Sequence, residues 1–435
     1  MSSTVKKVLI ITYYWPPSGG ASVQRWLKLT KYLPEYGIEP IVLTVDENSA
    51  TYPVLDSSFE KEIDSRTRVY KTKSFEILKL FSLLVGKKKV PYGGFSNVNT
   101  KSISSKIFRF IRGNLFIPDA RVGWNRYAYK KAVEIIDKYN IDTVITTSPP
   151  HSSQLIGLKL KRRHKIKWII DINDPWTDIY YYETLFHLNC IKKIDLKYER
   201  ESINTSDRII VNCQSNQELY QSKLRTNDKD KFIIVPNGFD SADFENINKV
   251  TTEEFIFTYT GTITELYEPD LFFKLVRKLI TRYQDISFKL LFVGTVSPTI
   301  KEDVEKYGLV NVTQYLGVLP HRQAIEYAVN STVLLNIFPK TTHDKGVPGK
   351  LGEYLATKNP IISIGPTDGD SALIIEETLS GKSFSRDMED ELMAYLIELV
   401  EQWKEDSRSL QNNSDKIYPY SRKYGAEQIA NLIKK

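Results

Sequence analysis

The chain has 435 residues, of which 41% are apolar and 26% are charged, as in ordinary globular proteins. This composition excludes a disordered chain and a disulfide scaffold, and the length predicts two or three domains. The two cysteines, Cys190 and Cys213, fit a reducing compartment, so we expect a cytoplasmic protein.

The charge is divided unevenly along the sequence. Residues 1–235 hold 38 lysines and arginines against 24 acidic residues, a balance of +14. Residues 236–435 hold 22 against 29, a balance of −7. Such asymmetry predicts two domains that face different partners.

The first half alternates apolar runs with segments of helical spacing. Its opening run, 8–14, is continuously apolar, which is typical of a strand buried on both faces of a parallel sheet. The later expected strands are 39–45, 142–148, 167–173, 207–213 and 232–237. This alternation predicts a doubly wound α/β domain.

The second half repeats the alternation from Phe255 onward. Its expected strands are 255–261, 288–294, 312–317, 332–338 and 360–365. Its expected helices are 269–283, 299–307, 320–329, 350–357, 387–406 and 422–434. We therefore expect an α/β fold with two Rossmann-like domains in series, over 1–235 and 236–415.

The segment 71–120 interrupts the pattern and is strongly basic. It holds ten lysines and arginines, including Lys87, Lys88, Lys89, Lys106, Arg109 and Arg112. Apolar residues at 103, 107, 110 and 111 share one helical face between the basic ones. Three structures fit this pattern: a helix on an anionic membrane surface, the acceptor side of a cleft, and an amphipathic helix packed on its own domain. Nucleic acid is disfavoured as a partner, because no recognised binding module is visible.

The loop after the first strand contains Gly19 and Gly20. Backbone amides at the start of the following helix could bind an anion, and glycine permits its close approach. The alternative is a tight strand-to-helix turn without a ligand. The loop is not G-x-G-x-x-G, so a nicotinamide cofactor is disfavoured.

The segment 343–362 is the most informative one for ligand binding. Its loop contains Gly346 and Gly349 and opens a helix near Lys350. Amides at the helix start, up to Leu351, together with two lysines, Lys345 and Lys350, would form a cradle for a diphosphate. Glu353, one turn into the helix, could hold the paired hydroxyls of a ribose, or it could simply favour the helix dipole.

Four segments in chain order resemble one enzyme family. KGVPGKLGE (345–353) resembles the E-x7-E region of the retaining GT-B glycosyltransferases called family four. VPNGFDSADF (235–244) resembles their interdomain segment. DINDPW (171–176) and the stretch 13–44 resemble members from surface-polysaccharide pathways.

The resemblance implies the GT-B fold, in which two Rossmann-like domains border an interdomain cleft. The C-terminal domain would hold a nucleotide-sugar donor, and the N-terminal domain would hold the acceptor. Transfer would retain the anomeric configuration, without a metal or another cofactor. The last helix, within 416–435, would join the N-terminal domain.

The chain departs from the family pattern on the donor side. Lys345 stands where the first glutamate of E-x7-E is expected, with Asp344 adjacent but out of register. The usual arginine and lysine after the first strand of the C-terminal domain are missing from 261–270. Their roles would fall to groups near that strand and to basic residues elsewhere, namely Gly261, Thr262, Thr264, Arg322, Lys345 and Lys350.

The resemblance also suggests residues on the acceptor side. The family histidine expected near 171–173 is absent, and Asn173 and Asp174 occupy that place. Asp174 and Trp176 would line the cleft, unless Asp174 only caps a helix. His151 follows another strand and would act with Asp174 in catalysis, or be incidental. His321 and Arg322 would lie near the base of the donor, or merely open a surface helix.

We therefore expect transfer of a sugar from a nucleotide sugar to a glycan or lipid-linked saccharide acceptor, in surface polysaccharide or glycoconjugate synthesis. The enzyme would be cytoplasmic, either free or peripheral on the inner face of the cell membrane. Two alternatives stay open. One is a GT-B nucleotide-sugar epimerase, and the other is a degenerate, non-catalytic transferase-like protein that only binds a partner.

Overall fold

The computed structural model describes residues 5–76, 103–179, 182–226, 228–250, 252–340, 345–405, 410 and 415–435. It divides into two compact units. Unit 1 comprises Met1–Pro236 and Arg422–Lys435, and unit 2 comprises Asn237–Ser421. Of the basic segment, residues 77–102 lie outside the described residues, including Lys87, Lys88 and Lys89, and so does Asp344.

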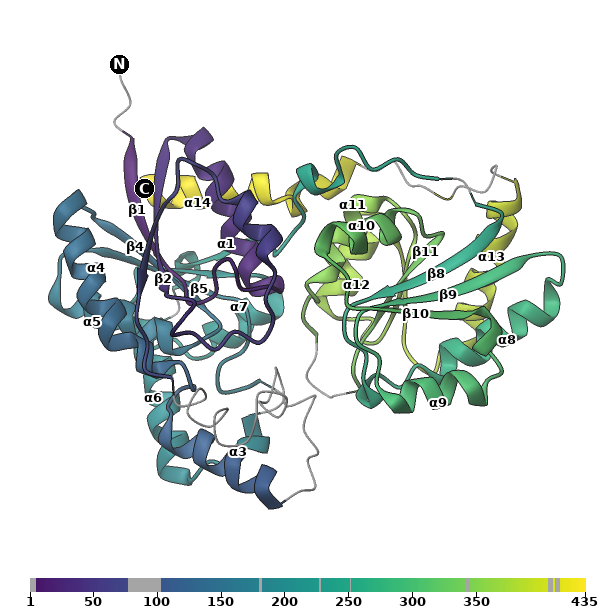
Figure 1. Cartoon of the computed structure of the whole chain (residues 1–435), viewed down its shortest axis with the longest axis horizontal. Helices are drawn as coiled ribbons and strands as arrows, with labels where there is room; N and C mark the ends of the chain where they lie inside the picture. Colours follow the sequence, from purple (N-terminus) through teal and green to yellow (C-terminus); the bar gives the residue numbers. More distant parts are fainter. Residues whose placement is uncertain are drawn as a thin grey trace. The chain divides into compact units, whose positions relative to one another are not determined.

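Unit 1 is built on a seven-stranded sheet whose described strands all pair in parallel (Figure 1). The strand order is β3-β2-β1-β4-β5-β6-β7. The strands are β1 (Lys6–Ile11), β2 (Ile38–Val45), β3 (Arg68–Thr72), β4 (Thr143–Ser148), β5 (Lys167–Ile172), β6 (Arg208–Val211) and β7 (Phe232–Ile234). The apolar runs that predicted the central strands are fully buried in them, because both faces of a parallel sheet are covered by helices.

The described helices of unit 1 are α1 (Ala21–Tyr32), α3 (Ile103–Leu115), α4 (Asn125–Tyr139), α5 (Ser152–Arg163), α6 (Asn189–Thr205), α7 (Gln214–Gln221) and α14 (Arg422–Lys434). The last helix, α14, packs on α1. Ile429 and Ile433 of α14 share a buried apolar cluster with Trp26 and Leu29 of α1, so the C-terminal helix is part of the core of unit 1.

Unit 2 is built on a second parallel sheet of six described strands in the order β10-β9-β8-β11-β12-β13. The strands are β8 (Glu254–Thr260), β9 (Ser287–Val293), β10 (Thr313–Gly317), β11 (Val333–Ile337), β12 (Ile361–Ile364) and β13 (Gly381–Phe384). The helices are α8 (Asp270–Arg282), α9 (Pro298–Lys306), α10 (His321–Val329), α11 (Lys350–Thr357), α12 (Asp370–Glu377) and α13 (Glu389–Glu405). The expected fold class, two Rossmann-like α/β units of the GT-B type, is confirmed.

Three elements were not expected from the sequence: β3, α12 and β13. Both strands lie at the edge of their sheets, and most of their residues are only partly buried or exposed. Edge strands of this kind lack the long apolar run that marks a central strand.

Candidate functional site

The expected donor residues of unit 2 follow the carboxyl ends of its strands. Gly261 comes directly after β8 and has φ of 104°, in the region that favours glycine. Gly294 follows the neighbouring strand β9, and a Cβ placed there would lie 2.2 Å from the carbonyl oxygen of Gly261. The two backbones therefore approach closely, and they leave Thr262 exposed at this edge of the sheet.

The loop before α11 is held by the start of α12. The carbonyl oxygens of Lys345 and Gly346 accept hydrogen bonds from Asp370 N (2.8 Å) and Ser371 Oγ (3.0 Å). The ammonium group of Lys345 is exposed and pairs with Asp368. The loop backbone is thus fixed before Gly349, which precedes the first residue of α11.

Lys350 has an unusual environment for a lysine. Its ammonium nitrogen is buried, has no hydrogen-bond partner among the described residues, and lies 3.3 Å from the centroid of the Tyr259 ring. Burial lowers the pKa of Lys350 well below its usual value, because desolvation disfavours the charged form. The sequence thus places an amine beside the last residues of β8, where the family pattern expected a basic pair.

Helix α11 is itself tightly positioned in unit 2. The Tyr354 hydroxyl accepts a hydrogen bond from Thr260 N (2.8 Å) at the end of β8, and Leu351 is fully buried. A Cβ on Gly352 would lie 2.7 Å from the carbonyl carbon of Gly238, so the helix approaches that backbone closely. These contacts fix the backbone that carries Lys350 and Glu353.

Glu353 and His321 form a pair between two helix N-termini. His321 Nε2 lies 2.8 Å from Glu353 Oε1, and the side chains are 13% and 22% exposed. Arg322 points elsewhere: its guanidinium donates to the carbonyl oxygen of Glu245 (3.2 Å) and lies 3.6 Å from the Glu326 carboxylate. The structure thus brings together His321 and Glu353, while Arg322 lies on the surface of its own unit.

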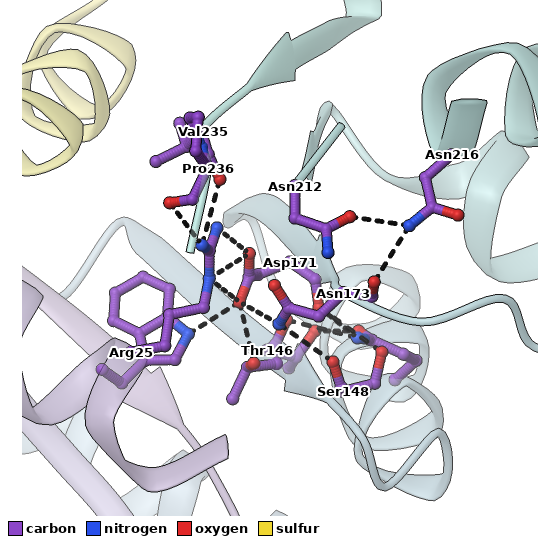
Figure 2. A network of polar contacts seen from close by, with 12 residues as sticks. Arg25, Thr146, Ser148, Asp171, Asn173, Asn212, Asn216, Val235 and Pro236 are labelled. Carbon is purple, nitrogen blue, oxygen red and sulfur yellow. Dashed lines mark hydrogen bonds and ion pairs between the residues drawn. The ribbon is translucent and has the colours of Figure 1, made fainter. Parts of the chain in front are cut away.

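Unit 1 contains a network of polar contacts at the end of β5, and the fully buried Asp171 lies at its centre (Figure 2). Its carboxylate accepts hydrogen bonds from Arg25 Nη2, Trp26 Nε1 and Thr147 Oγ1, each at 2.8 Å. Arg25 Nη1 also donates to the carbonyl oxygens of Val235 (3.0 Å) and Pro236 (3.1 Å). The Asp171 carboxylate therefore has a structural role. It links α1, β4 and β5 directly, and through Arg25 it also holds the backbone at Val235 and Pro236.

Asn173 is oriented by this network. Its Nδ2 atom donates to the carbonyl oxygen of Ser148 (3.1 Å) and to Asp171 Oδ2 (3.2 Å) (Figure 2). Its own carbonyl oxygen accepts from Asn216 Nδ2 (2.9 Å). The Oδ1 atom of Asn173 is buried without a hydrogen-bond partner among the described residues. A fixed acceptor atom thus lies just beyond the end of β5.

The turn after Asn173 places Trp176 inside unit 1. Its indole N–H donates to Asp195 Oδ1 (2.8 Å), and its ring stacks on His151 with 4.9 Å between centroids. Burial lowers the pKa of His151 to about 4, and its Nδ1 atom has no hydrogen-bond partner in the described part of the chain. At neutral pH His151 is therefore an uncharged imidazole.

Asp174 does not begin a helix, so the expected alternative of a helix cap is wrong. Residues 173–179 form bends and a turn, and the Tyr220 hydroxyl donates to the Asp174 carbonyl oxygen (2.8 Å). The segment instead carries its polar and aromatic side chains in an irregular loop over α6 and α7.

Sequence analysis missed two acidic residues of α6 that support this turn. Asp195 accepts from Trp176 and from the Tyr182 hydroxyl (2.9 Å), and burial raises its pKa to about 7. Glu199, fully buried, accepts from Thr177 Oγ1 (2.6 Å) and pairs with Lys223 (2.7 Å). The spacing of four residues puts both carboxylates on one helical face, which is the signal that could have found them.

The glycine loop of unit 1 is a tight turn. Gly20 precedes α1 with φ of 94°, and Gly19 N donates to the Val54 carbonyl oxygen (2.9 Å). The amide of Gly19 is thus already engaged within the protein. The anion-binding role of the two glycines stays a prediction.

Helix α3 differs from the expectation for the basic segment. Arg109 was expected to attract a membrane, but its side chain is buried with its guanidinium 5.2 Å from the Phe186 ring centroid. Phe110 and Ile111 were expected on a common apolar face and are each 43% exposed. The helix is amphipathic, but its apolar residues do not all pack on unit 1.

The described residues contain no group of three or more histidine, cysteine or acidic side chains that could hold a metal ion. Within the same residues, no helix is both long and apolar enough to cross a membrane.

Comparison with known proteins supports the family resemblance. Residues 96–243 match the model of the family described as Glycosyltransferase Family 4. Over this segment the chain is similar to glycosyltransferase family four. The resemblance inferred from the four motifs is thereby confirmed, and the coarse function is that of a glycosyltransferase of the GT-B type. No curated protein sequence matches the chain.

Solved structures of similar fold cover nearly the whole chain. A glycosyltransferase from Rickettsia africae is 14% identical, with a TM-score of 0.61 and coverage of 99% of this chain and 98% of that one. Anabaena HepE in complex with UDP-glucose is 11% identical, with a TM-score of 0.59 and coverage of 98% and 99%. A putative UDP-N-acetylglucosamine 2-epimerase from Listeria monocytogenes is 12% identical, with a TM-score of 0.56 and coverage of 99% and 96%. At these identities the likeness shows the fold alone.

Proposed function

We propose that this family-four glycosyltransferase transfers a sugar from a nucleotide-sugar donor to a glycan or lipid-linked saccharide acceptor. The transfer retains the anomeric configuration and serves surface polysaccharide or glycoconjugate synthesis. The observation that carries the proposal is the environment of Lys350, a buried amine without a hydrogen-bond partner among the described residues, on the first residue of α11.

Lys350 and the start of α11 have the chemistry of a diphosphate site. The first amides of a helix carry partial positive charge and lack partners within the helix. A diphosphate placed there would supply the charge that a buried ammonium group lacks, and it would raise the fraction of Lys350 that is protonated. Lys350 thus takes the role of the basic pair that is missing from 261–270, and no metal is needed.

On the acceptor side, Asn173, Asp174 and His151 are the groups proposed to orient the attacking hydroxyl. The described residues leave the acceptor atom Asn173 Oδ1 and the ring nitrogen His151 Nδ1 without hydrogen bonds. The attacking oxygen bonds to the anomeric carbon as the bond to the diphosphate breaks, and the leaving diphosphate oxygen receives the proton. The protein then acts mainly by positioning and by stabilising charge.

The test begins with a thermal-shift screen of the full chain against UDP, GDP, ADP and their sugars, since binding to the folded state alone raises the midpoint. The nucleotide sugar that binds is then incubated with the protein, and its conversion is followed by proton NMR. Slow release of free sugar that initially has the same anomeric configuration as the donor supports a retaining transferase. Conversion to an isomeric nucleotide sugar identifies an epimerase, and a chain that binds no nucleotide supports a non-catalytic role.

A second observation favours an association with the membrane. Phe110, Ile111 and Leu115 of α3 are exposed, and so are Phe186 and Leu188 of the adjacent segment. The side chain of Asn114 joins the two segments through the Phe186 carbonyl oxygen (3.1 Å) and the Leu188 amide (2.7 Å). We call these five apolar residues the α3 patch. With exposed Lys106 and Lys193 near it in the chain, the patch suits the interface of an anionic bilayer.

Vesicle flotation tests this second proposal. The wild-type chain should float with vesicles of phosphatidylglycerol and phosphatidylcholine, and partly detach as salt is raised. Ile111→Ser with Leu115→Ser should abolish flotation, whereas Val250→Ser, a change of an exposed valine in unit 2, should not. A wild-type chain that ignores anionic vesicles at low salt contradicts the membrane proposal and leaves the donor proposal intact.

A further inference from the structure

The His321–Glu353 pair joins two helices that also pack on each other, since Ala328 of α10 shares a buried apolar cluster with Leu351 and Leu355 of α11. His321 is the first residue of α10, and Glu353 lies in the first turn of α11. His321 Nε2 lies 2.8 Å from Glu353 Oε1, and both side chains are mostly shielded from solvent. A hydrogen bond in such a place fixes the direction in which the Glu353 carboxylate points.

The backbone below Glu353 is fixed independently of this pair. Gly352 lies against Gly238, and Tyr354 is bound to Thr260 at the end of β8. A glutamate side chain nevertheless has several rotatable bonds, so a fixed Cα does not fix its carboxylate. The additional constraint comes from His321, because one carboxylate oxygen is held by the imidazole ring.

We propose that His321 is a positioning residue for ribose recognition, holding the Glu353 carboxylate ready to accept hydrogen bonds from the ribose hydroxyls of the donor nucleotide. The inference deepens the proposed function and rests on it. The proposal predicts that the site binds a ribonucleotide more tightly than the 2′-deoxyribonucleotide. The deoxy ligand lacks the 2′-hydroxyl, so the oriented Glu353 carboxylate loses the hydrogen bond that this hydroxyl would donate. If the pair were only a link between helices, its loss would affect all ligands alike.

The experiment measures binding of the full chain to whichever of UDP, GDP and ADP raises the melting midpoint most, and to its 2′-deoxy form. Isothermal titration calorimetry gives the ratio of the two affinities for the wild type, His321→Ala, His321→Gln and Glu353→Gln. A hydrogen bond to a charged group corresponds to roughly a tenfold or greater preference. The wild type should show such a preference for the ribonucleotide, and His321→Ala should reduce it at least threefold.

His321→Gln should keep part of the preference, since its amide N–H can still donate to Glu353. Gln323→Ala, an exposed change in the same turn of α10, is the matched control and should keep the full preference. If His321→Ala lowers the affinity for both ligands equally, or changes neither affinity, this inference is overturned while the proposed function stands. A wild-type chain that binds none of the three nucleotides overturns both.

Discussion

The ammonium nitrogen of Lys350 lies 3.3 Å from the centroid of the Tyr259 ring and has no hydrogen-bond partner among the described residues. A buried polar group of this kind lowers the stability of a fold unless it is paired. Strongly shifted, poorly satisfied groups gather at functional sites, where a ligand supplies the missing interaction. The Lys350–Tyr259 contact therefore supports the proposed donor site of unit 2.

Replacing Lys350 by methionine should separate stability from function. Methionine can fill the space of the lysine methylene groups without the buried amine, so the free energy of unfolding should rise by about 1–3 kcal/mol. Affinity for the nucleoside diphosphate should fall at least tenfold, because its charge partner is gone. Urea unfolding and calorimetry measure the two effects. A less stable variant with unchanged nucleotide affinity would show that Lys350 is purely structural.

Removing the guanidinium of Arg25 should strongly destabilise unit 1. In Arg25→Met the fully buried Asp171 carboxylate loses its ion pair, and the Val235 and Pro236 carbonyl oxygens lose a donor. Breaking one side of a buried pair costs about 3–5 kcal/mol of unfolding free energy. Chemical denaturation measures the loss. The double variant with Asp171→Asn should be less destabilised than the sum of the two single changes. Additive losses would contradict the coupling.

Asp195 should make stability depend on pH between about 4 and 7. Its pKa is about 7 in the folded chain, against about 3.9 for an ordinary aspartate. Within this window the folded chain keeps a proton that the unfolded chain has released, so stability falls as the pH rises. The loss is complete above pH 7 and amounts to at most about 4 kcal/mol.

Asp195→Asn removes this contribution while it keeps an oxygen for the Trp176 N–H. The melting temperature of the variant, relative to the wild type, should therefore rise from pH 4.5 to pH 7.5. His151 acts in the opposite sense, because its lowered pKa makes stability rise with pH from about 4 to 6.5. Comparing the variant with the wild type at each pH cancels that effect. A difference that does not change with pH would show that Asp195 is ionised throughout.

Gly352→Ala should disturb α11 directly. The added methyl group would lie 2.7 Å from the carbonyl carbon of Gly238 in a backbone that leaves little room. Overpacking of this kind costs about 1–3 kcal/mol, more than the helix propensity of alanine returns. Thermal unfolding should show a lower midpoint. A midpoint at or above that of the wild type would mean that the helix shifts without strain.

Much of the fold was predictable because parallel sheets bury their central strands on both faces. The apolar runs at 8–14, 167–173 and 255–261 mark β1, β5 and β8 to within a few residues. The edge strands β3 and β13 could not be found in the same way. Their residues are largely half-buried or exposed, so their sequences RVYKT and GKSF carry little hydrophobic signal.

The candidate site was predictable only where it depends on strand ends and helix starts. The loop before α11 was found from its glycines and lysines, because these residues act through local geometry. The contacts of Glu353 with His321 and of Trp176 with Asp195 join residues that are 32 and 19 positions apart. Such pairings depend on how helices pack, which the spacing along the chain does not encode.

The most direct test of the account is hydrogen–deuterium exchange of the full chain, with and without a saturating nucleoside diphosphate. Slowed exchange should appear in peptides covering 261–264 and 346–357, where the nucleotide is proposed to meet the end of β8 and the start of α11. Protection confined to peptides from residues 1–236, at a concentration that saturates binding, would contradict the proposed donor site of unit 2.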